Sequence, residues 1–189
     1  MDEMVIRAMA KWPNVPAVSG WLSLDRRGEW KLRGEPIPNR AAVAFISRNY
    51  SSDDRGRWFF QNGPQRVFVD LDYTPWVYSF DGRGVLVTHT GRECRAVDSA
   101  WLDEAGIMIL VGEPGPGIVD DRDLMALSER LHDSRGAPVE DEFVAAFIAS
   151  RPGAEPALWL GHDDTRVRVR RIDSGEVAER LRFEPHPRA

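Results

Sequence analysis

The chain has 189 residues, a formal net charge of -5 and an ordinary hydrophobic content that includes 7 Trp and 8 Phe residues. This length fits one domain or two small ones, and the negative charge argues against general binding to nucleic acids or to acidic membranes. The single cysteine, Cys94, excludes an internal disulfide and any zinc site built from several cysteines.

The N-terminal segment carries Asp2 and Glu3 and lacks the basic and hydrophobic regions of a signal peptide. No hydrophobic run approaches the roughly 18 residues of a membrane-spanning helix. We therefore expect a cytoplasmic protein with neither a membrane nor a nucleic acid as its partner.

In the first half, the pattern predicts two helices and a series of short strands. One helix is expected over residues 3–11 and ends near Pro13, because proline disfavours helical backbone. The other is expected over residues 40–49, with Asn39 as its N-cap. Strands are expected at residues 20–25, 29–33, 57–61, 66–71, 76–80, 84–89 and 94–97.

The second half is expected to repeat this plan with modifications. A helix is predicted over residues 122–133, where Leu124, Leu127 and Leu131 form one apolar stripe. A further helix is predicted near residues 139–150, and residues 112–117 are expected to form an irregular loop. Strands are expected at residues 100–103, 107–111, 157–160 and 165–172, and near 177–183.

Two pairs of matching segments indicate that the halves are related. Residues 24–36 and 102–114 share Leu, Asp, Gly, Leu, Gly, Glu and Pro at an offset of 78 residues. Residues 58–69 and 158–169 share Arg, Val and Val at an offset of 100 residues. Because the offset grows, the second half holds additional residues, which one extra helix would supply.

The predicted fold class is α+β with mostly antiparallel sheet, because the strand spacings are too short for parallel crossovers. Two structurally related β-β-α-β-β halves are expected, with an extra helix in the second. The expected division is an N-terminal half over residues 1–98 and a C-terminal half over residues 99–189.

The first half also carries the residues of a family resemblance. The segments concerned are Gly20-Trp21, Leu24-Asp25-x-x-Gly28-x-Trp30, Gly34-x-Pro36-Ile37, Thr74-Pro75-Trp76-Val77 and residues 12–16 and 56–60. In these segments the chain resembles a proteobacterial branch of uncharacterised bacterial proteins that are described as a domain of unknown function. The resemblance covers about residues 12–112 and implies an α+β fold with a repeated motif and a suggested link to signalling. It carries over no catalytic residue, and the helical insertion at residues 118–150 departs from it.

Repeat-equivalent acidic residues are the first candidates for chemistry. If the halves pack about a pseudo-twofold axis, Glu35 and Glu113 could converge as a general acid-base pair. The alternative is that each Gly-Glu-Pro ends a strand, with its glutamate exposed. Asp25 and Asp103 are expected to stabilise hairpin turns through their side chains.

Other reactive residues have simpler structural explanations. A Cys94–His89 nucleophile pair needs a contact that the spacing does not establish. The run His162-Asp163-Asp164 is expected to be a turn, and Asp120 with its neighbours is expected to cap a helix and not to bind a cation. Residues 112–117 lack the donors of a phosphate cradle. We therefore name no catalytic residue, no metal ligand and no cofactor.

Aromatic residues crowd the first half, and strand alternation prevents one sheet face from burying them all. Some are expected to line a groove or an interface, and Arg166 could meet an anionic group. The favoured function is a non-catalytic module that senses a small ligand or binds a protein. The alternatives are a hydrolase that uses acidic residues between the halves and a structural subunit that forms a homodimer. The candidate ligand-binding residues are Trp30, Glu35, Trp58, Trp76, Glu113 and Arg166.

Overall fold

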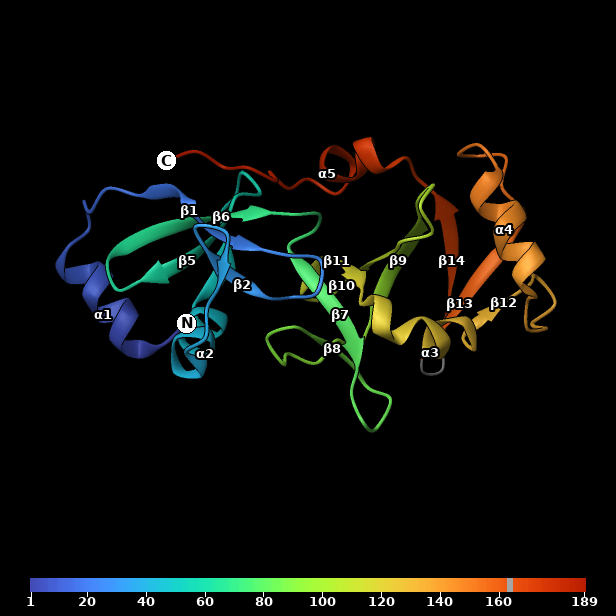
Figure 1. Ribbon diagram of the computed structural model, residues 1–189, viewed down its shortest axis with the longest axis horizontal. Coiled ribbons are helices and arrows are strands. Elements are labelled where there is room, and N and C mark those ends of the chain that lie inside the picture. The colour runs from blue at the N-terminus through green and yellow to red at the C-terminus, as the bar shows by residue number, and fades with distance from the viewer. Residues whose placement is uncertain (163–164) are drawn as a thin grey trace. The chain divides into compact units, whose positions relative to one another are not determined.

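The computed structural model describes residues 1–162 and 165–189. The chain divides into two compact units: unit 1 comprises Met1–Pro75 with Ala178–Ala189, and unit 2 comprises Trp76–Val177. The division expected between residues 98 and 99 falls inside unit 2, because the strand Trp76–Phe80 pairs with a later strand of the same unit (Figure 1).

Unit 1 contains a six-stranded sheet with the order β3-β2-β1-β6-β5-β4. Its first two helices are α1 (Glu3–Lys11) and α2 (Arg40–Arg48), close to the predicted ranges. Asn39 caps α2, because its Oδ1 accepts the N–H groups of Ala41 and Ala42. The strands are β1 (Val18–Leu24), β2 (Trp30–Leu32), β3 (Glu35–Pro36), β4 (Tyr50–Ser52), β5 (Trp58–Asn62) and β6 (Gln65–Leu71).

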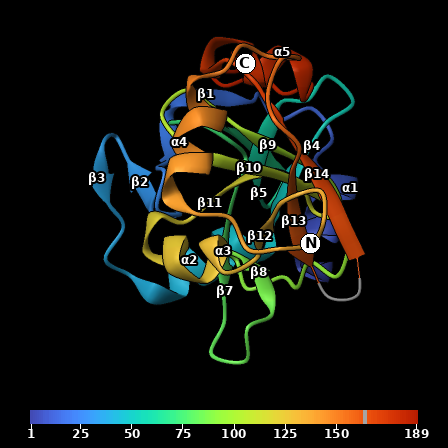
Figure 2. The ribbon, with the colours of Figure 1, turned by 90° about the vertical axis from the view of Figure 1, so that its right-hand side faces the viewer.

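Unit 2 contains an eight-stranded sheet with the order β12-β13-β14-β9-β10-β11-β7-β8. Its helices are α3 (Leu124–Ser128), preceded by the 3-10 turn η1 (Asp121–Asp123), and α4 (Asp141–Ala149) (Figure 2). Residues that are almost fully buried fill its core, among them Ile109, Phe147 and Leu158. The strands are β7 (Trp76–Phe80), β8 (Leu86–Thr88), β9 (Val97–Leu102), β10 (Met108–Gly112), β11 (Gly115–Val119), β12 (Leu131–His132), β13 (Leu158–His162) and β14 (Thr165–Arg171).

The two sheets pair six of their strands in the same order. The run β3-β2-β1-β6-β5-β4 of unit 1 corresponds to β11-β10-β9-β14-β13-β12 of unit 2. In each sheet the central pair, β1 with β6 and β9 with β14, is parallel, and the other pairs of the run are antiparallel. Unit 2 adds α4 between β12 and β13 and the β7-β8 hairpin at the sheet edge.

The correspondence extends to the register of single residues. Leu24 pairs with Trp30 and with Leu71, and its counterpart Leu102 pairs with Met108 and with Arg171. These partners lie at the same offsets, 78 and 100 residues, as the two pairs of matching segments. Descent of the two units from one duplicated ancestor stays a prediction, which this shared register supports.

The same turn chemistry closes several hairpins. Asp25 Oδ1 accepts the backbone N–H groups of Arg27 and Glu29 (both 2.9 Å), and Asp103 Oδ1 accepts those of Ala105 and Ile107 (2.9 and 2.8 Å). The expected turn role of both aspartates is therefore what the structure shows. Asp53, Asp81 and Asp133 make equivalent bonds, each three residues before a glycine with positive φ.

Three expected elements of the second half need correction. Residues 115–119 form strand β11 and not a loop, because they pair with both β10 and β7. The helix expected over 122–133 ends at Ser128, because Leu131 is buried by pairing with β13. The strand expected near 177–183 is instead the short helix α5 (Val177–Arg180), followed by Arg182 in the left-handed region.

These elements confirm the predicted class, α+β with mostly antiparallel strands. Each half holds more short strands than the expected β-β-α-β-β pattern, because two-residue and three-residue strands leave almost no alternation in the sequence. The alternation predicted for residues 166–170 is present: Val167 and Val169 are buried, and the arginines between them are exposed.

Candidate functional site

The predicted site residues Trp30 and Trp58 lie in the core of unit 1. Both rings contact Tyr50, with centroids 5.0 Å away in each case. The Trp30 indole N–H donates to Ser47 Oγ (3.2 Å), and burial raises the pKa of the Tyr50 phenol well above its ordinary value. The structure places these two tryptophans in a packed aromatic cluster, where they support the sheet.

Trp76 lies in the core of unit 2. Its side chain is 4% exposed, and its indole N–H donates to the Pro114 carbonyl oxygen at 2.8 Å. Two residues further along the strand, Tyr78 donates its hydroxyl to the Gly115 carbonyl oxygen (2.7 Å), and burial raises the pKa of Tyr78 far above its ordinary value. Both side chains hold β7 against the start of β11.

The charged members of the predicted site lie in different places. Glu35 belongs to unit 1 and is exposed, and Glu113 belongs to unit 2 and accepts the Arg95 N–H (3.0 Å). Arg166 donates to the Asp133 carbonyl oxygen (2.8 Å), and its guanidinium lies 5.4 Å from the Trp159 ring centroid. Among the described residues, none of the six predicted ligand-binding residues lines either cavity described below.

The other residues considered for chemistry have structural roles. The buried Cys94 thiol donates to the Ala96 carbonyl oxygen (3.2 Å), and burial raises its pKa. Asp120 Oδ1 accepts the Arg122 N–H, as a cap does, and Asp123 Oδ2 accepts the Phe80 N–H (3.0 Å). Asp163 and Asp164 lie outside the described residues. The described part of the chain holds no group of three or more His, Cys, Asp or Glu side chains placed to bind a metal.

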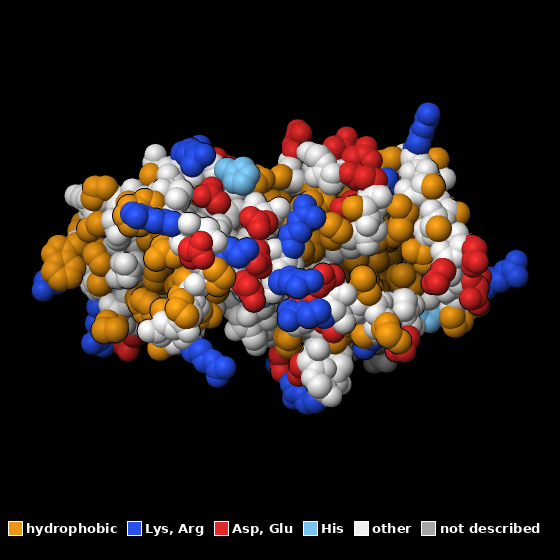
Figure 3. All heavy atoms as spheres, in the orientation of Figure 1, with side chains coloured by type: hydrophobic (Ala, Val, Ile, Leu, Met, Phe, Trp, Pro, Cys, Tyr) orange, Lys and Arg blue, Asp and Glu red, His pale blue; other side chains and the backbone are white. Residues whose placement is uncertain are grey.

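A groove of about 520 Å³ lies between α2 and one face of the unit 1 sheet. We call it the apolar groove. Its lining is almost entirely hydrophobic, and hydrophobic side chains reach the surface over β2 and α2 (Figure 3). Asn62 and Gln65 supply polar atoms at the hairpin that joins β5 to β6. The main hydrophobic residues that line it are Trp21, Leu22, Leu32, Ile46, Phe60 and Val67.

An irregular stretch of β1 turns Trp21 toward the groove. The pairing of β1 with β6 shifts register between Val18 and Leu22, and Gly20 between them has φ +74°, which favours glycine. Consecutive strand residues normally face opposite sides, but Trp21 and Leu22 both line the groove. The Arg33 guanidinium lies 4.1 Å from the Trp21 ring centroid, and the Arg33 N–H donates to the Trp21 carbonyl oxygen (2.7 Å). The bulge and this contact hold the indole at the mouth.

The corresponding position of unit 2 is filled. Leu32 and Leu110 occupy the same register in β2 and β10, opposite Leu22 and Ala100. Leu32 is 50% exposed and Leu110 is 1% exposed. In unit 2 the strand β11 has five residues and pairs on both sides, whereas its counterpart β3 has two residues and lies at a sheet edge. Unit 1 therefore leaves open a hydrophobic surface whose counterpart within unit 2 is covered.

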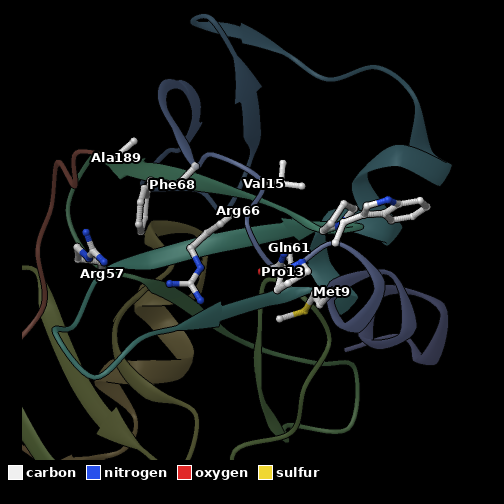
Figure 4. Close-up of a pocket in the computed structure, with 11 residues that line it drawn as sticks. Met9, Pro13, Val15, Arg57, Gln61, Arg66, Phe68 and Ala189 are labelled. Atoms are coloured by element: carbon white, nitrogen blue, oxygen red, sulfur yellow. The ribbon is translucent and has the colours of Figure 1, made fainter.

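A second cavity, of about 410 Å³, lies on the opposite face of the same sheet. Alternation along β6 separates the two: Gln65 and Val67 line the apolar groove, and Arg66 and Phe68 line the second cavity. We call it the arginine pocket. Arg57, Gln61 and Arg66 surround it, with Met9 and Pro13 from the N-terminal segment (Figure 4).

Neither cavity was predicted from the sequence. The alternation of Arg66, Val67 and Phe68 indicates two faces, but it does not show which face stays uncovered. Trp21 is one of the aromatic residues of the first half, some of which were expected to line a groove or an interface; it lines the apolar groove but was not among the predicted site residues. The signal that could have singled it out is the preceding Gly20, because a glycine inside a strand often marks a bulge.

Comparison with known proteins places these features in a family. Residues 1–188 match a family model with the description "Protein of unknown function (DUF2946)". No curated protein matches the chain. No helix among the described residues combines the length and hydrophobicity that crossing a membrane requires.

Two solved structures are similar to this one. A DUF1285 family protein from Silicibacter pomeroyi DSS-3 shares 18% identity, with 90% of this chain and 96% of that chain covered and a TM-score of 0.55. A DUF1285 family protein from Shewanella baltica OS155 shares 18% identity over 56% of this chain and 87% of that chain, with a TM-score of 0.42. The first likeness shows a shared fold and nothing of the function.

The expected resemblance to a proteobacterial family of unknown function is thus confirmed, without its repeated motif being tested. The match runs through both units and includes residues 118–150, which had been expected to depart from the family. The chain belongs to the family described as "Protein of unknown function (DUF2946)".

Proposed function

We propose that the protein is a non-catalytic, ligand-sensing module whose apolar groove binds a small, mainly hydrophobic molecule. The observation that carries the proposal is the contrast between Leu32, half exposed in the groove, and its buried counterpart Leu110. A hydrophobic cavity with few polar groups is the usual form of a small-molecule site. The volume of about 520 Å³ falls in the range of such sites.

The chemistry of the lining indicates what the ligand must offer. Contact with Trp21 and Leu32 would remove hydrophobic surface from water, which is worth about 25 cal/mol for each Å² covered. Asn62 and Gln65 could hydrogen-bond one polar end of the ligand and so fix its orientation. A hydrocarbon or flat aromatic body with one neutral polar group satisfies these requirements.

Sensing would follow from the position of α2. Ala42 and Ile46 of this helix line the groove, so a bound molecule bridges the helix and the sheet. A ligand that binds only the folded state raises its stability by an amount set by ligand concentration and affinity. A ligand bound in the apolar groove would therefore make α2 and β2 more ordered, and this increased order would be the signal.

The test is titration of the full chain with the neutral dye Nile red, followed by dye fluorescence. We expect saturable binding to the wild type and roughly tenfold weaker binding to Leu32→Asp, because burying a charge in place of a leucine costs more than about 1.4 kcal/mol. The matched control is Leu124→Asp, at a leucine of similar exposure in α3 of unit 2. This control should bind the dye like the wild type.

Two outcomes would contradict the proposal. Wild-type protein that shows only linear, non-saturating fluorescence has no such site. Equal weakening by Leu32→Asp and Leu124→Asp would mean that the dye responds to general surface hydrophobicity.

A further inference from the structure

We infer that the arginine pocket is a second binding site, specific for a small carboxylate that carries both a hydroxyl group and a hydrocarbon side chain. The pocket is separate from the apolar groove and lies on the other face of the unit 1 sheet. Three features of its lining correspond to the three parts of this ligand. A guanidinium group can pair with its carboxylate, a buried amide oxygen can accept its hydroxyl group, and a hydrophobic wall can contact its hydrocarbon side chain.

The positive charge comes from Arg57 and Arg66. Arg57 binds Asp53 closely, with Nη2 and Nε 2.8 and 2.9 Å from Oδ2. Arg66 reaches the same oxygen only at 3.6 Å. Burial would raise the pKa of Asp53, but the hydrogen bonds from the Arg57 side chain and from backbone N–H groups lower it. One carboxylate, that of Asp53, thus lies between two permanent cations, and the more distant one, Arg66, is the cation that an organic carboxylate could pair with.

Each guanidinium lies close to an aromatic ring. The Arg66 guanidinium lies 4.1 Å from the Phe59 centroid, and that of Arg57 lies 4.5 Å from the Phe68 centroid. Stacking of this kind fixes a guanidinium plane and leaves its edge available for hydrogen bonds. The Arg57 nitrogens already donate to Asp53 and, through Nη1, to the Arg188 carbonyl oxygen (3.3 Å), so the donors offered to a ligand are those of Arg66. The Arg66 guanidinium is oriented before any anion arrives, which reduces the entropy lost on binding.

Gln61 supplies the hydroxyl acceptor. Its side chain is 2% exposed, and Nε2 donates to the Gly63 carbonyl oxygen at 3.0 Å. Its Oε1 is buried and has no hydrogen-bond partner among the residues that the structure describes. Figure 4 shows this side chain between Pro13 and Arg66. A buried acceptor left unpaired is costly, so a ligand O–H that reaches it gains a hydrogen bond without displacing another partner.

The remaining wall is hydrophobic. Met9, Trp12 and Val15 come from α1 and the segment after it, and Phe68 comes from β6. Methionine and tryptophan side chains suit a branched hydrocarbon group, because they adapt to its shape and offer a large contact area. The volume of about 410 Å³ fits a molecule of this kind.

Unit 2 provides a natural control for this site. Arg166 corresponds to Arg66 and likewise lies over an aromatic ring of the paired strand, that of Trp159, at 5.4 Å. At the position of Gln61, however, unit 2 has Gly161, which offers no side-chain amide. Substitution of Arg166 therefore removes an equivalent cation–aromatic pair without touching the arginine pocket.

The experiment compares two probes by calorimetric titration of the full chain at neutral pH. The probes are α-hydroxyisocaproate and isocaproate, which differ only by the hydroxyl group. We expect the wild type to bind α-hydroxyisocaproate roughly three- to tenfold more tightly than isocaproate, as one hydrogen bond implies. Gln61→Met should abolish this preference, because methionine has a similar shape and no amide oxygen.

Arg66→Gln should weaken both probes roughly tenfold or more, and Arg166→Gln should leave both affinities unchanged. Arg66→Lys retains the charge and serves as a second variant if Arg66→Gln fails to fold. Three results would overturn the inference. The wild type could bind neither probe, it could bind both with equal affinity, or the Arg66 and Arg166 substitutions could have equal effects. Arg66→Gln should still bind Nile red like the wild type, because Arg66 does not line the apolar groove. Failure of the arginine pocket can therefore be told apart from failure of the proposed function.

Discussion

Aspartate side chains set the geometry of the hairpins one residue at a time. Asp25, Asp53, Asp81, Asp103 and Asp133 each accept two backbone N–H groups from the turn that follows. The carboxylate thereby satisfies donors that have no partner in the ladder. Ionised oxygens accept more strongly than neutral ones, so these turns couple local structure to pH.

Asp133 allows this coupling to be tested. The N–H of Ala137, followed by that of Arg135, holds the pKa of Asp133 below its ordinary value of 3.8. A lowered folded-state pKa stabilises the protein above the unfolded-state pKa, and this contribution is lost as pH falls through the folded-state pKa. Between about pH 5 and about pH 3, urea unfolding should therefore show a steeper loss of stability for the wild type than for Asp133→Asn. Parallel curves for the two proteins would contradict the role of the charge.

Trp76 tests the core at the same scale. Its buried ring is part of the core of unit 2, so Trp76→Ala should lower the free energy of unfolding by about 3–5 kcal/mol. Trp12 is half exposed, and Trp12→Ala should change the same quantity by less than about 1 kcal/mol. Chemical denaturation of both variants measures the difference, and similar values for the two would show that Trp76 is not a core residue.

At the scale of elements, the strand β11 is held in place by close packing of its backbone. A Cβ at Gly117 would lie 2.6 Å from Tyr78 Cε2 and 2.8 Å from the Trp76 carbonyl oxygen. Gly117→Ala should therefore destabilise the protein by about 1–3 kcal/mol, because rigid neighbours must move. Gly82→Ala is the control, since a Cβ there would meet no atom within 4 Å and the φ of Gly82 is not in the left-handed region. Thermal unfolding of the two variants should separate them, and equal midpoints would show that β11 tolerates the added methyl group.

The same strand shows what the sequence could and could not predict. The hairpins around Asp25 and Asp103 were predictable, because an aspartate followed by a glycine between alternating residues is a local signal. Strand β11 was not, because Gly115, Pro116 and Gly117 are typical of loops and only pairing with β7 and β10 makes them a strand. The early end of α3 has the same origin: a tertiary contact of Leu131 overrides its helical spacing.

The sites were less predictable than the elements. Three of the predicted site residues were chosen because they are aromatic: Trp30, Trp58 and Trp76. All three are buried in the hydrophobic core. The cavities instead depend on which parts of a sheet face are left uncovered, as at Leu32, which is 50% exposed. Coverage of a face is decided by distant segments and leaves no mark in the residues that line it.

At the scale of the whole molecule, the chain order of the units has a consequence for stability. Unit 2 is one continuous segment, whereas unit 1 needs both Met1–Pro75 and Ala178–Ala189. Backbone hydrogen bonds join this later segment to the rest of unit 1. The Leu71 N–H donates to the Pro185 carbonyl oxygen (2.8 Å), and the Glu184 N–H donates to the Gly56 carbonyl oxygen (3.0 Å).

Separate expression of the units tests this organisation. The segment 76–177 should unfold cooperatively by itself, with circular dichroism typical of a folded α+β protein. The segment 1–75 should be less stable than the same segment joined to residues 178–189 by a Gly/Ser linker, since only the latter restores the two backbone hydrogen bonds. Equal denaturant midpoints for the two forms of unit 1 would show that the later segment contributes nothing.

The parallel pairing of β1 with β6, and of β9 with β14, also bears on how the protein folds. Each central pair joins the earliest and latest strands of its run, so the middle of the sheet is completed last along the chain. Closing such long loops costs entropy before any contact compensates it, which slows folding. During synthesis, one edge of β1 therefore stays unpaired until β6 has been made, and one edge of β9 until β14 has been made. At this stage the chain would benefit most from a chaperone that covers the unpaired edge.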